Sequence, residues 1–152
     1  YANLDLLKIL WGKSLTDPLD ETLQDYFFTK GLTLAIKLYN RHSQDTTYVS
    51  SLARKAFLYS LETMESEDPS KAMMINDYIQ KIKPGLQMNR IIRPILFLKL
   101  DKPEMARQII HQGKDKRYQS DFYISYNGMQ YSCIYAEIMD MFDVSANSLS
   151  LN

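Results

Sequence analysis

Three alanines recur at nearly constant spacing, and this spacing constrains the fold more than any other feature. Ala35, Ala72 and Ala106 lie 37 and then 34 residues apart, and Pro69 and Pro103 are also 34 residues apart. Apolar residues lie three positions after each alanine and eight positions before it: Leu38, Ile75 and Ile109, and Phe27, Met64 and Leu98. In repeated helical hairpins a small residue lies where the second helix crosses the first, because a larger side chain would separate them. The spacing therefore predicts such hairpins.

Turn and capping residues divide the chain between the apolar segments. Asp17-Pro18, Asp68-Pro69 and Lys102-Pro103 are typical of helix starts, and Pro84-Gly85 predicts a turn. The predicted fold is all-α: stacked antiparallel helical hairpins forming an α-solenoid of about four repeats. We expect one domain over residues 1–142, with repeats near 18–45, 46–84, 86–117 and 120–142, and a frayed tail at 143–152. An irregular helical bundle is the alternative.

The first residues fit an amphipathic helix from Asn3 to Trp11, which we interpret as the second helix of an earlier repeat. The longest apolar run, Ile91 to Leu100, is interrupted by Arg93, Pro94 and Lys99, so no membrane span and no membrane partner are expected. The single cysteine, Cys133, allows no disulfide within the chain; it favours a reducing, intracellular compartment and is expected to be a buried thiol.

No catalytic constellation is evident. The two histidines, His42 and His111, lie near the ends of predicted second helices, where they favour the helix dipole. Neither a glycine-rich phosphate loop nor a zinc-protease motif occurs. The acidic group at Glu62, Glu65, Glu67 and Asp68 is typical of a solvated helix end and cap rather than a metal site. We therefore expect a protein that is not an enzyme, with no cofactor, no metal and no small-molecule substrate.

The period and the alanine early in the second helix resemble the tetratricopeptide and pentatricopeptide repeat families. Ile124 to Met129 (Ile-Ser-Tyr-Asn-Gly-Met) is similar to the start of a pentatricopeptide first helix, and Ile82-Lys83-Pro84 to the close of such a repeat. The resemblance covers roughly residues 18–142 and implies a protein of organellar RNA metabolism or translation, located in mitochondria. It places Asn127 within one residue of the base-reading position. At the matching positions the middle repeats have apolar residues, Phe57 or Leu58 and Ile91 or Ile92.

The same segment allows a second interpretation. Tyr126-Asn127-Gly128-Met129 between aromatic alternating runs is also typical of a type I′ β-hairpin. Residues 122–135 are therefore either a helix or a hairpin.

Basic residues recur one period apart on predicted first helices, which line the concave face of a solenoid. Lys55 and Asn89 are 34 residues apart, and Arg54 and Arg90 are 36 apart, with Arg93 one turn further on. Guanidinium groups suit phosphate or carboxylate recognition. The sequence predicts a basic strip that binds RNA or a protein partner. The alternative is that these are surface charges paired with nearby acids.

A second basic cluster, Lys114, Lys116 and Arg117, runs into aromatic residues. Tyr118, Tyr123 and Tyr126 are candidates for stacking on the bases of single-stranded RNA. Tyrosines at such spacing are also typical of a core seam.

Two functions follow from these patterns. The first is a pentatricopeptide-like module that contacts single-stranded RNA. The second is a tetratricopeptide-like protein-binding scaffold or structural subunit of a larger assembly. The charge balance, 18 basic against 18 acidic residues, and the apolar base-reading positions favour the second, because RNA-binding domains are usually basic. The Tyr126-Asn127 start and the Ile82-Lys83-Pro84 close favour the first, which is the function we expect, with the scaffold as the alternative.

Overall fold

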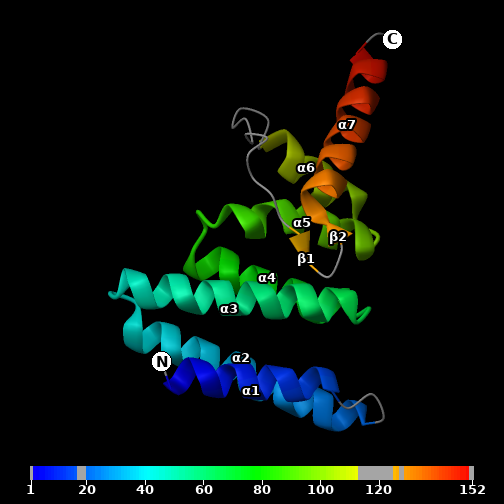
Figure 1. Ribbon diagram of the computed structural model, residues 1–152. Coiled ribbons are helices and arrows are strands. Elements are labelled where there is room, and N and C mark those ends of the chain that lie inside the picture. The colour runs from blue at the N-terminus through cyan, green and yellow to red at the C-terminus, as the bar shows by residue number, and fades with distance from the viewer. Residues whose placement is uncertain (1, 17–19, 113–124, 127–128, 151–152) are drawn as a thin grey trace. The chain divides into compact units, whose positions relative to one another are not determined.

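The computed structural model describes residues 2–16, 20–112, 125–126 and 129–150. Within them the chain forms seven α-helices and one two-stranded ladder (Figure 1). The elements are α1 (Ala2–Thr16), α2 (Glu21–His42), α3 (Thr46–Glu65), α4 (Pro69–Ile82), α5 (Gln87–Lys99), α6 (Pro103–Gln112), β1 (Ser125–Tyr126), β2 (Met129–Gln130) and α7 (Tyr131–Ser150). The helices pack as adjacent pairs, which confirms an all-α fold, whereas the regular solenoid stays a prediction. No described helix is both long and apolar enough to cross a bilayer.

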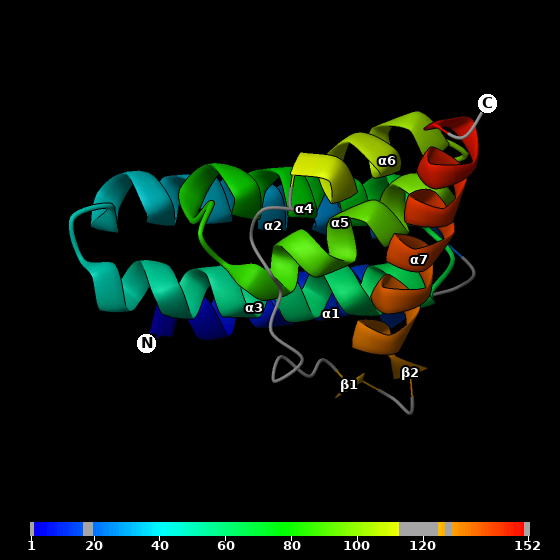
Figure 2. The ribbon, with the colours of Figure 1, turned by 90° about the horizontal axis from the view of Figure 1, so that it is seen from above.

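The chain divides into two compact units, residues 1–86 and 87–152. In the first unit α1 pairs with α2 and α3 pairs with α4; seen from above, α3 lies over α1 and α4 over α2 (Figure 2). In the second unit α5 packs against α6 and α7. The division follows the predicted Pro84-Gly85 turn, which the Leu86 N–H closes by donating to the Lys83 carbonyl at 3.1 Å.

Aspartates begin three of the helices. The side chains of Asp20, Asp45 and Asp68 each accept a hydrogen bond of 3.1 Å from the backbone N–H three residues later. Such N-caps satisfy donors that a helix start leaves open. The helix starts predicted at Pro69 and Pro103 are confirmed. The start predicted at residues 17–18 lies outside the described residues, and α2 begins after Asp20.

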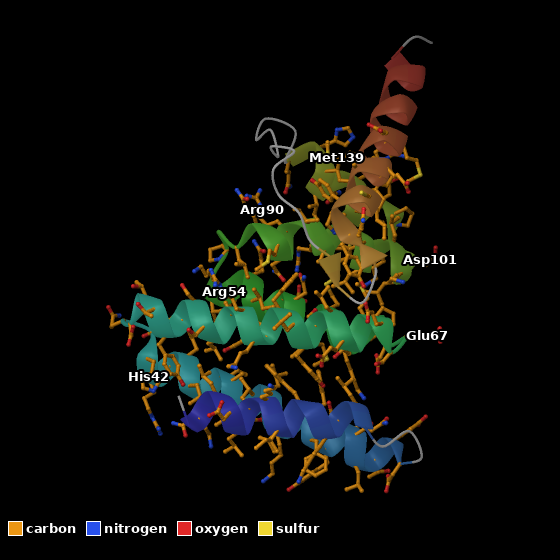
Figure 3. The ribbon with its side chains drawn as sticks, viewed as in Figure 1. His42, Arg54, Glu67, Arg90, Asp101 and Met139 are labelled. Carbon is orange, nitrogen blue, oxygen red and sulfur yellow. The ribbon has the colours of Figure 1, made fainter. Side chains whose placement is uncertain are left out.

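The turns before α4 and α6 have the same backbone geometry. Glu67 and Asp101 both adopt left-handed conformations, with φ of 62° and 58°. The next residue in each turn donates its N–H back to the preceding helix, Asp68 to Thr63 at 3.2 Å and Lys102 to Phe97 at 2.8 Å. This is the hydrogen bond of a Schellman C-cap. In Figure 3 both left-handed residues lie just beyond the ends of α3 and α5. The two hairpins thus share a turn at a 34-residue period.

The first hairpin is built differently. The repeat pattern would place a turn shortly before Ala35, but Lys30 and Gly31, in the corresponding positions, lie inside the continuous helix α2. The partner of α2 is α1, so α1 is the first helix of this hairpin rather than the second helix of an earlier repeat. Ala35 is nevertheless 0% exposed, as are Ala72 and Ala106. The periodic alanines were therefore correctly predicted as packing residues, although the local chain around Ala35 was not.

Large aromatic side chains join the helices of the first unit. Trp11 of α1 stacks on Tyr59 of α3, with ring centroids 4.5 Å apart and planes 2° apart. The indole also packs on Gly31, where a Cβ atom would overlap it. Two side-chain hydrogen bonds also join helices of this unit. The Tyr78 hydroxyl donates to the Ala35 carbonyl at 2.7 Å, and the Ser60 hydroxyl donates to the Ala72 carbonyl at 3.0 Å. The second bond fits the predicted close crossing at Ala72.

The segment near residue 126, for which the sequence allowed either a helix or a hairpin, lies in the second unit. β1 and β2 pair antiparallel, with Ser125 opposite Gln130 and Tyr126 opposite Met129. The hairpin interpretation is therefore confirmed for residues 125–126 and 129–130, whereas residues 131–135 belong to helix α7. Residues 127–128, and with them Asn127 and the turn type, lie outside the described residues.

Cys133 was wrongly predicted to be buried. The buried face of α7 carries Tyr131, Tyr135, Ile138 and Phe142, and Cys133 lies on the opposite side, exposed. Its thiol contacts the side-chain oxygen of Gln130 at 3.2 Å. Beyond residue 142 the backbone continues α7 to Ser150, and the frayed tail stays a prediction.

Candidate functional site

The strongest candidate site in the first unit is a groove of about 210 Å³ between the first helices of its two hairpins, α1 and α3. On α3 its lining residues occupy positions 55, 58, 59 and 62, the i, i+3, i+4 and i+7 spacing of one stripe along a helix. The lining consists of Lys8, Trp11 and Gly12 from α1 and Lys55, Leu58, Tyr59 and Glu62 from α3. We name this the α1–α3 groove.

The floor of the α1–α3 groove is the stacked pair Trp11 and Tyr59. Both rings are buried, at 2% and 5% exposed, and the Tyr59 hydroxyl hydrogen-bonds the hydroxyl of Ser14. Ser14 in turn donates to the Trp11 carbonyl at 2.6 Å. Burial raises the pKa of Tyr59 above its usual value, although the hydrogen bonds from Ser14 and Thr63 oppose this. The floor is therefore a neutral surface in which the two buried rings stack on each other.

The rim of the α1–α3 groove is charged. Lys8 is exposed on α1 and Lys55 is half-buried on α3. Neither lysine forms an ion pair in the part of the chain that the structure describes. Glu62 lies two turns beyond Lys55, and the exposed side chain of Leu58 lies between them. The groove is open above Gly12, where an added Cβ would meet no atom within 4 Å.

This arrangement limits what the α1–α3 groove can hold. Pockets for drug-sized ligands are about 300–1,000 Å³, so a volume of about 210 Å³ fits one or two side chains rather than a cofactor. Two ammonium groups beside an apolar surface suit a carboxylate flanked by an apolar side chain.

Lys55 is the predicted binding residue that lines this groove; Arg54, its neighbour on α3, is exposed but does not line it (Figure 3). Of the apolar residues at the base-reading positions of this hairpin, Phe57 is buried and Leu58 is exposed. Of the residues predicted to bind on α3, Lys55 thus lies in this groove and Arg54 does not, and α1 was not predicted to form part of a site.

The other half of the predicted basic strip lies on α5, in the second unit. Arg90 and Arg93 are half-buried, and the Arg93 guanidinium lies 5.3 Å from the centre of the Phe97 ring. Asn89 is 0% exposed, so its predicted role as a surface contact is wrong. Its position on α5 is enclosed because this helix is apolar on almost every side, with Ile91, Ile92 and Leu96 also buried. A strip joining α3 and α5 stays a prediction.

The remaining predicted contacts fall where the structure gives no side chains. Asn127, Tyr118 and Tyr123 lie outside the described residues, as do Lys114, Lys116 and Arg117. Tyr126 belongs to β1, but only its backbone is described. Tyr131, the next tyrosine after Tyr126 in the sequence, is buried, as the core-seam alternative predicts for such residues.

Both histidines lie in the last turns of their helices, α2 and α6. The His42 ring packs against the ring of Tyr48, 4.0 Å between centroids, which ties the end of α2 to the start of α3. This contact accounts for the position of His42 without any ligand.

Five residues that line the α1–α3 groove were not predicted as part of a site: Lys8, Trp11, Gly12, Tyr59 and Glu62. Trp11 is the one tryptophan of the chain and was assigned to an apolar helix face, but periodicity carries no information on which helix that face meets.

Searches against protein-family models, curated proteins and solved structures found no match to this chain, so no family is identified by comparison.

Proposed function

We propose that the first unit is a protein-interaction module that binds a peptide segment of a partner in the α1–α3 groove. The observation that carries this proposal is the pair of lysines, Lys8 and Lys55, facing an apolar surface between two adjacent first helices. Packed helical hairpins commonly present such surfaces for binding.

The groove chemistry defines the peptide. A carboxylate of the peptide meets the two ammonium groups, and an apolar side chain next to it covers Leu58 and the ring edges of Trp11 and Tyr59. Glu62 disfavours a second carboxylate at its end of the groove, because like charges repel. The preferred ligand is therefore an acidic residue adjacent to an apolar one, in one orientation.

Single-stranded RNA is the second candidate, as the pentatricopeptide resemblance implies. It is favoured by the exposed cations Lys8 and Arg54 on neighbouring helices, which suit phosphates. The groove itself favours a peptide, because RNA recognition of this kind relies on bases stacking on exposed rings. The rings of Trp11 and Tyr59 are stacked on each other and buried.

The test is selection of 12-residue peptides from a random display library on the whole chain. We expect enrichment of Asp or Glu next to an apolar residue, and a shift in Trp11 fluorescence when such a peptide binds. The K8E/K55E variant should bind the selected peptide about tenfold more weakly. K81E/K99E changes the charge equally at exposed lysines outside the groove and should leave binding unchanged.

Failure to select such peptides, or equal binding by K8E/K55E, contradicts the proposal. Binding of a 20-nucleotide oligouridylate that weakens steeply with salt and is lost in K8E/K55E, without peptide selection, would establish the RNA candidate instead.

A further inference from the structure

Helix α1 carries apolar residues on two faces. Leu4, Leu7 and Trp11 are buried against the rest of the first unit. On the outer side Leu6 is 46% exposed and Ile9 is 54% exposed. A surface helix that buries one face normally presents polar residues on the other. A second apolar face therefore indicates a surface that another molecule covers.

This outer face contains a groove between α1 and α2, of about 620 Å³, which we name the α1–α2 groove. Its α2 lining extends from Tyr26 to Lys37, a length of about 16 Å at 1.5 Å per residue. Its apolar lining is formed by four residues, Leu6, Leu10, Tyr26 and Leu34. The groove has the length and the apolar stripe that three turns of an amphipathic helix require.

The charges at the α1–α2 groove have one sign. Lys30 and Lys37 are exposed among the lining residues, and the Lys30 ammonium lies 5.3 Å from the centre of the Tyr26 ring. The acidic residues of the two helices, Asp5, Glu21 and Asp25, are absent from the lining, and Asp25 is paired with Lys71 at 2.5 Å. The apolar stripe is therefore bordered by positive charge.

The sign of this charge selects the occupant. A second copy docking by the same face in a symmetric dimer would place lysines opposite lysines, which is unfavourable. An apolar helix without charges would leave the ammonium groups uncompensated. We propose that the α1–α2 groove docks an acidic amphipathic helix of a partner protein, about three turns long, with glutamates or aspartates beside its apolar stripe. This second surface is independent of the α1–α3 groove.

The probe is a displayed library of 14-residue helical peptides with a fixed leucine stripe and flanking positions that sample Glu, Gln and Lys. Selection on the whole chain should enrich Glu at the flanks. The K30E/K37E variant should bind the best peptide about tenfold more weakly and should prefer the same peptide with Lys in place of Glu. The matched control K81E/K99E should bind the best peptide as the parent does.

Three outcomes overturn the inference. The first is no enrichment, or enrichment without Glu. The second is loss of binding in K8E/K55E together with retention in K30E/K37E, which would assign the peptide to the α1–α3 groove. The third is a dimer of the parent chain in sedimentation that L6E abolishes, which would make a second copy the occupant.

Discussion

The two hairpins of the first unit achieve close helix packing in opposite ways. In α3–α4 a small residue on the second helix, Ala72, lets α3 approach closely enough for the Ser60 hydroxyl to reach its carbonyl at 3.0 Å. In α1–α2 a large residue on the first helix, Trp11, fills the space that Gly31 leaves on the second. The comparison teaches that a repeated requirement, tight crossing, need not be met by a repeated residue pattern.

The hairpins also differ in their turns. The left-handed residue and the Schellman hydrogen bond before α4, and the proline that begins the helix, recur at α6, so the 34-residue spacing reflects a shared turn and helix start. The 37-residue spacing from Ala35 to Ala72 has no such origin, because Ala35 lies deep inside α2. Ala35 is buried where its carbonyl accepts the Tyr78 hydrogen bond from the next hairpin.

The largest effect is expected for Trp11→Ala, which removes the side chain that fills the first crossing. Truncating a buried tryptophan costs about 3–5 kcal/mol in free energy of unfolding, by loss of apolar burial and creation of a cavity. Urea unfolding followed by circular dichroism measures the change. Leu58→Ala, at an exposed position of the same groove, should change the free energy by less than about 0.5 kcal/mol. A loss below about 1 kcal/mol for Trp11→Ala would show that the indole does not hold the hairpins together.

Gly31→Ala sharpens the comparison, because its added methyl meets the indole. We expect destabilisation by about 1–3 kcal/mol from overpacking. Gly12→Ala is the matched control: it also lies inside a helix, but its Cβ has no neighbour within 4 Å. It should stabilise by about 0.5–1 kcal/mol, since alanine favours helix. Trp11 fluorescence reports both transitions, and equal effects of the two changes would contradict the described packing.

Tyr78→Phe tests the hydrogen bond between the hairpins. Losing it should cost about 0.5–1.5 kcal/mol at neutral pH, because one buried hydrogen bond is lost while the Ala35 carbonyl, inside α2, keeps its partner within the helix. Burial, together with the nearby Tyr39 and Tyr48, raises the pKa of Tyr78. A raised folded-state pKa gives stability that is present below the unfolded value of about 10 and is lost as pH rises above it.

The variant should therefore lose less stability than the parent between pH 9 and 11, measured by urea unfolding. Part of the alkaline loss should remain, because the pKa values of Tyr59 and Lys71 are raised too. For Lys71, burial alone would lower the pKa, but the hydrogen bond and charge of Asp25, with the charge of Asp68, outweigh it. An unchanged alkaline slope in Tyr78→Phe would refute this assignment.

The smallest effects concern the shared turn. Glu67→Gly and Asp101→Gly each remove the steric strain of a side chain in the left-handed conformation. Each should stabilise its hairpin by about 0.5–1 kcal/mol, after subtracting the conformational entropy that glycine adds to the unfolded chain. Similar gains, measured by hydrogen exchange of α4 and α6, would support a true structural repeat. A gain in one turn and a loss in the other would break the equivalence.

Much of the fold was predictable from signals within a few residues of one another. Asp68-Pro69, Lys102-Pro103 and Pro84-Gly85 mark helix starts and a turn because capping and proline geometry act within a few residues. The burial of Ala35, Ala72 and Ala106 was also predictable, since small side chains at helical spacing favour close packing. Of the candidate groove, Lys55 was predicted as a binding residue, whereas Asn89, the residue one period away that supported this prediction, is buried.

Only the tertiary structure decided which faces meet. The stacking of Trp11 on Tyr59, 48 positions away in the sequence, created the α1–α3 groove. Tertiary packing also decided that Asn89 is enclosed and that Cys133 is exposed. The physical reason is that helical periodicity shows that a face is apolar, whereas its partner depends on side-chain shapes and on distances between segments far apart in the chain. The sequence thus determined the helix starts at Pro69 and Pro103, and packing between helices made the grooves.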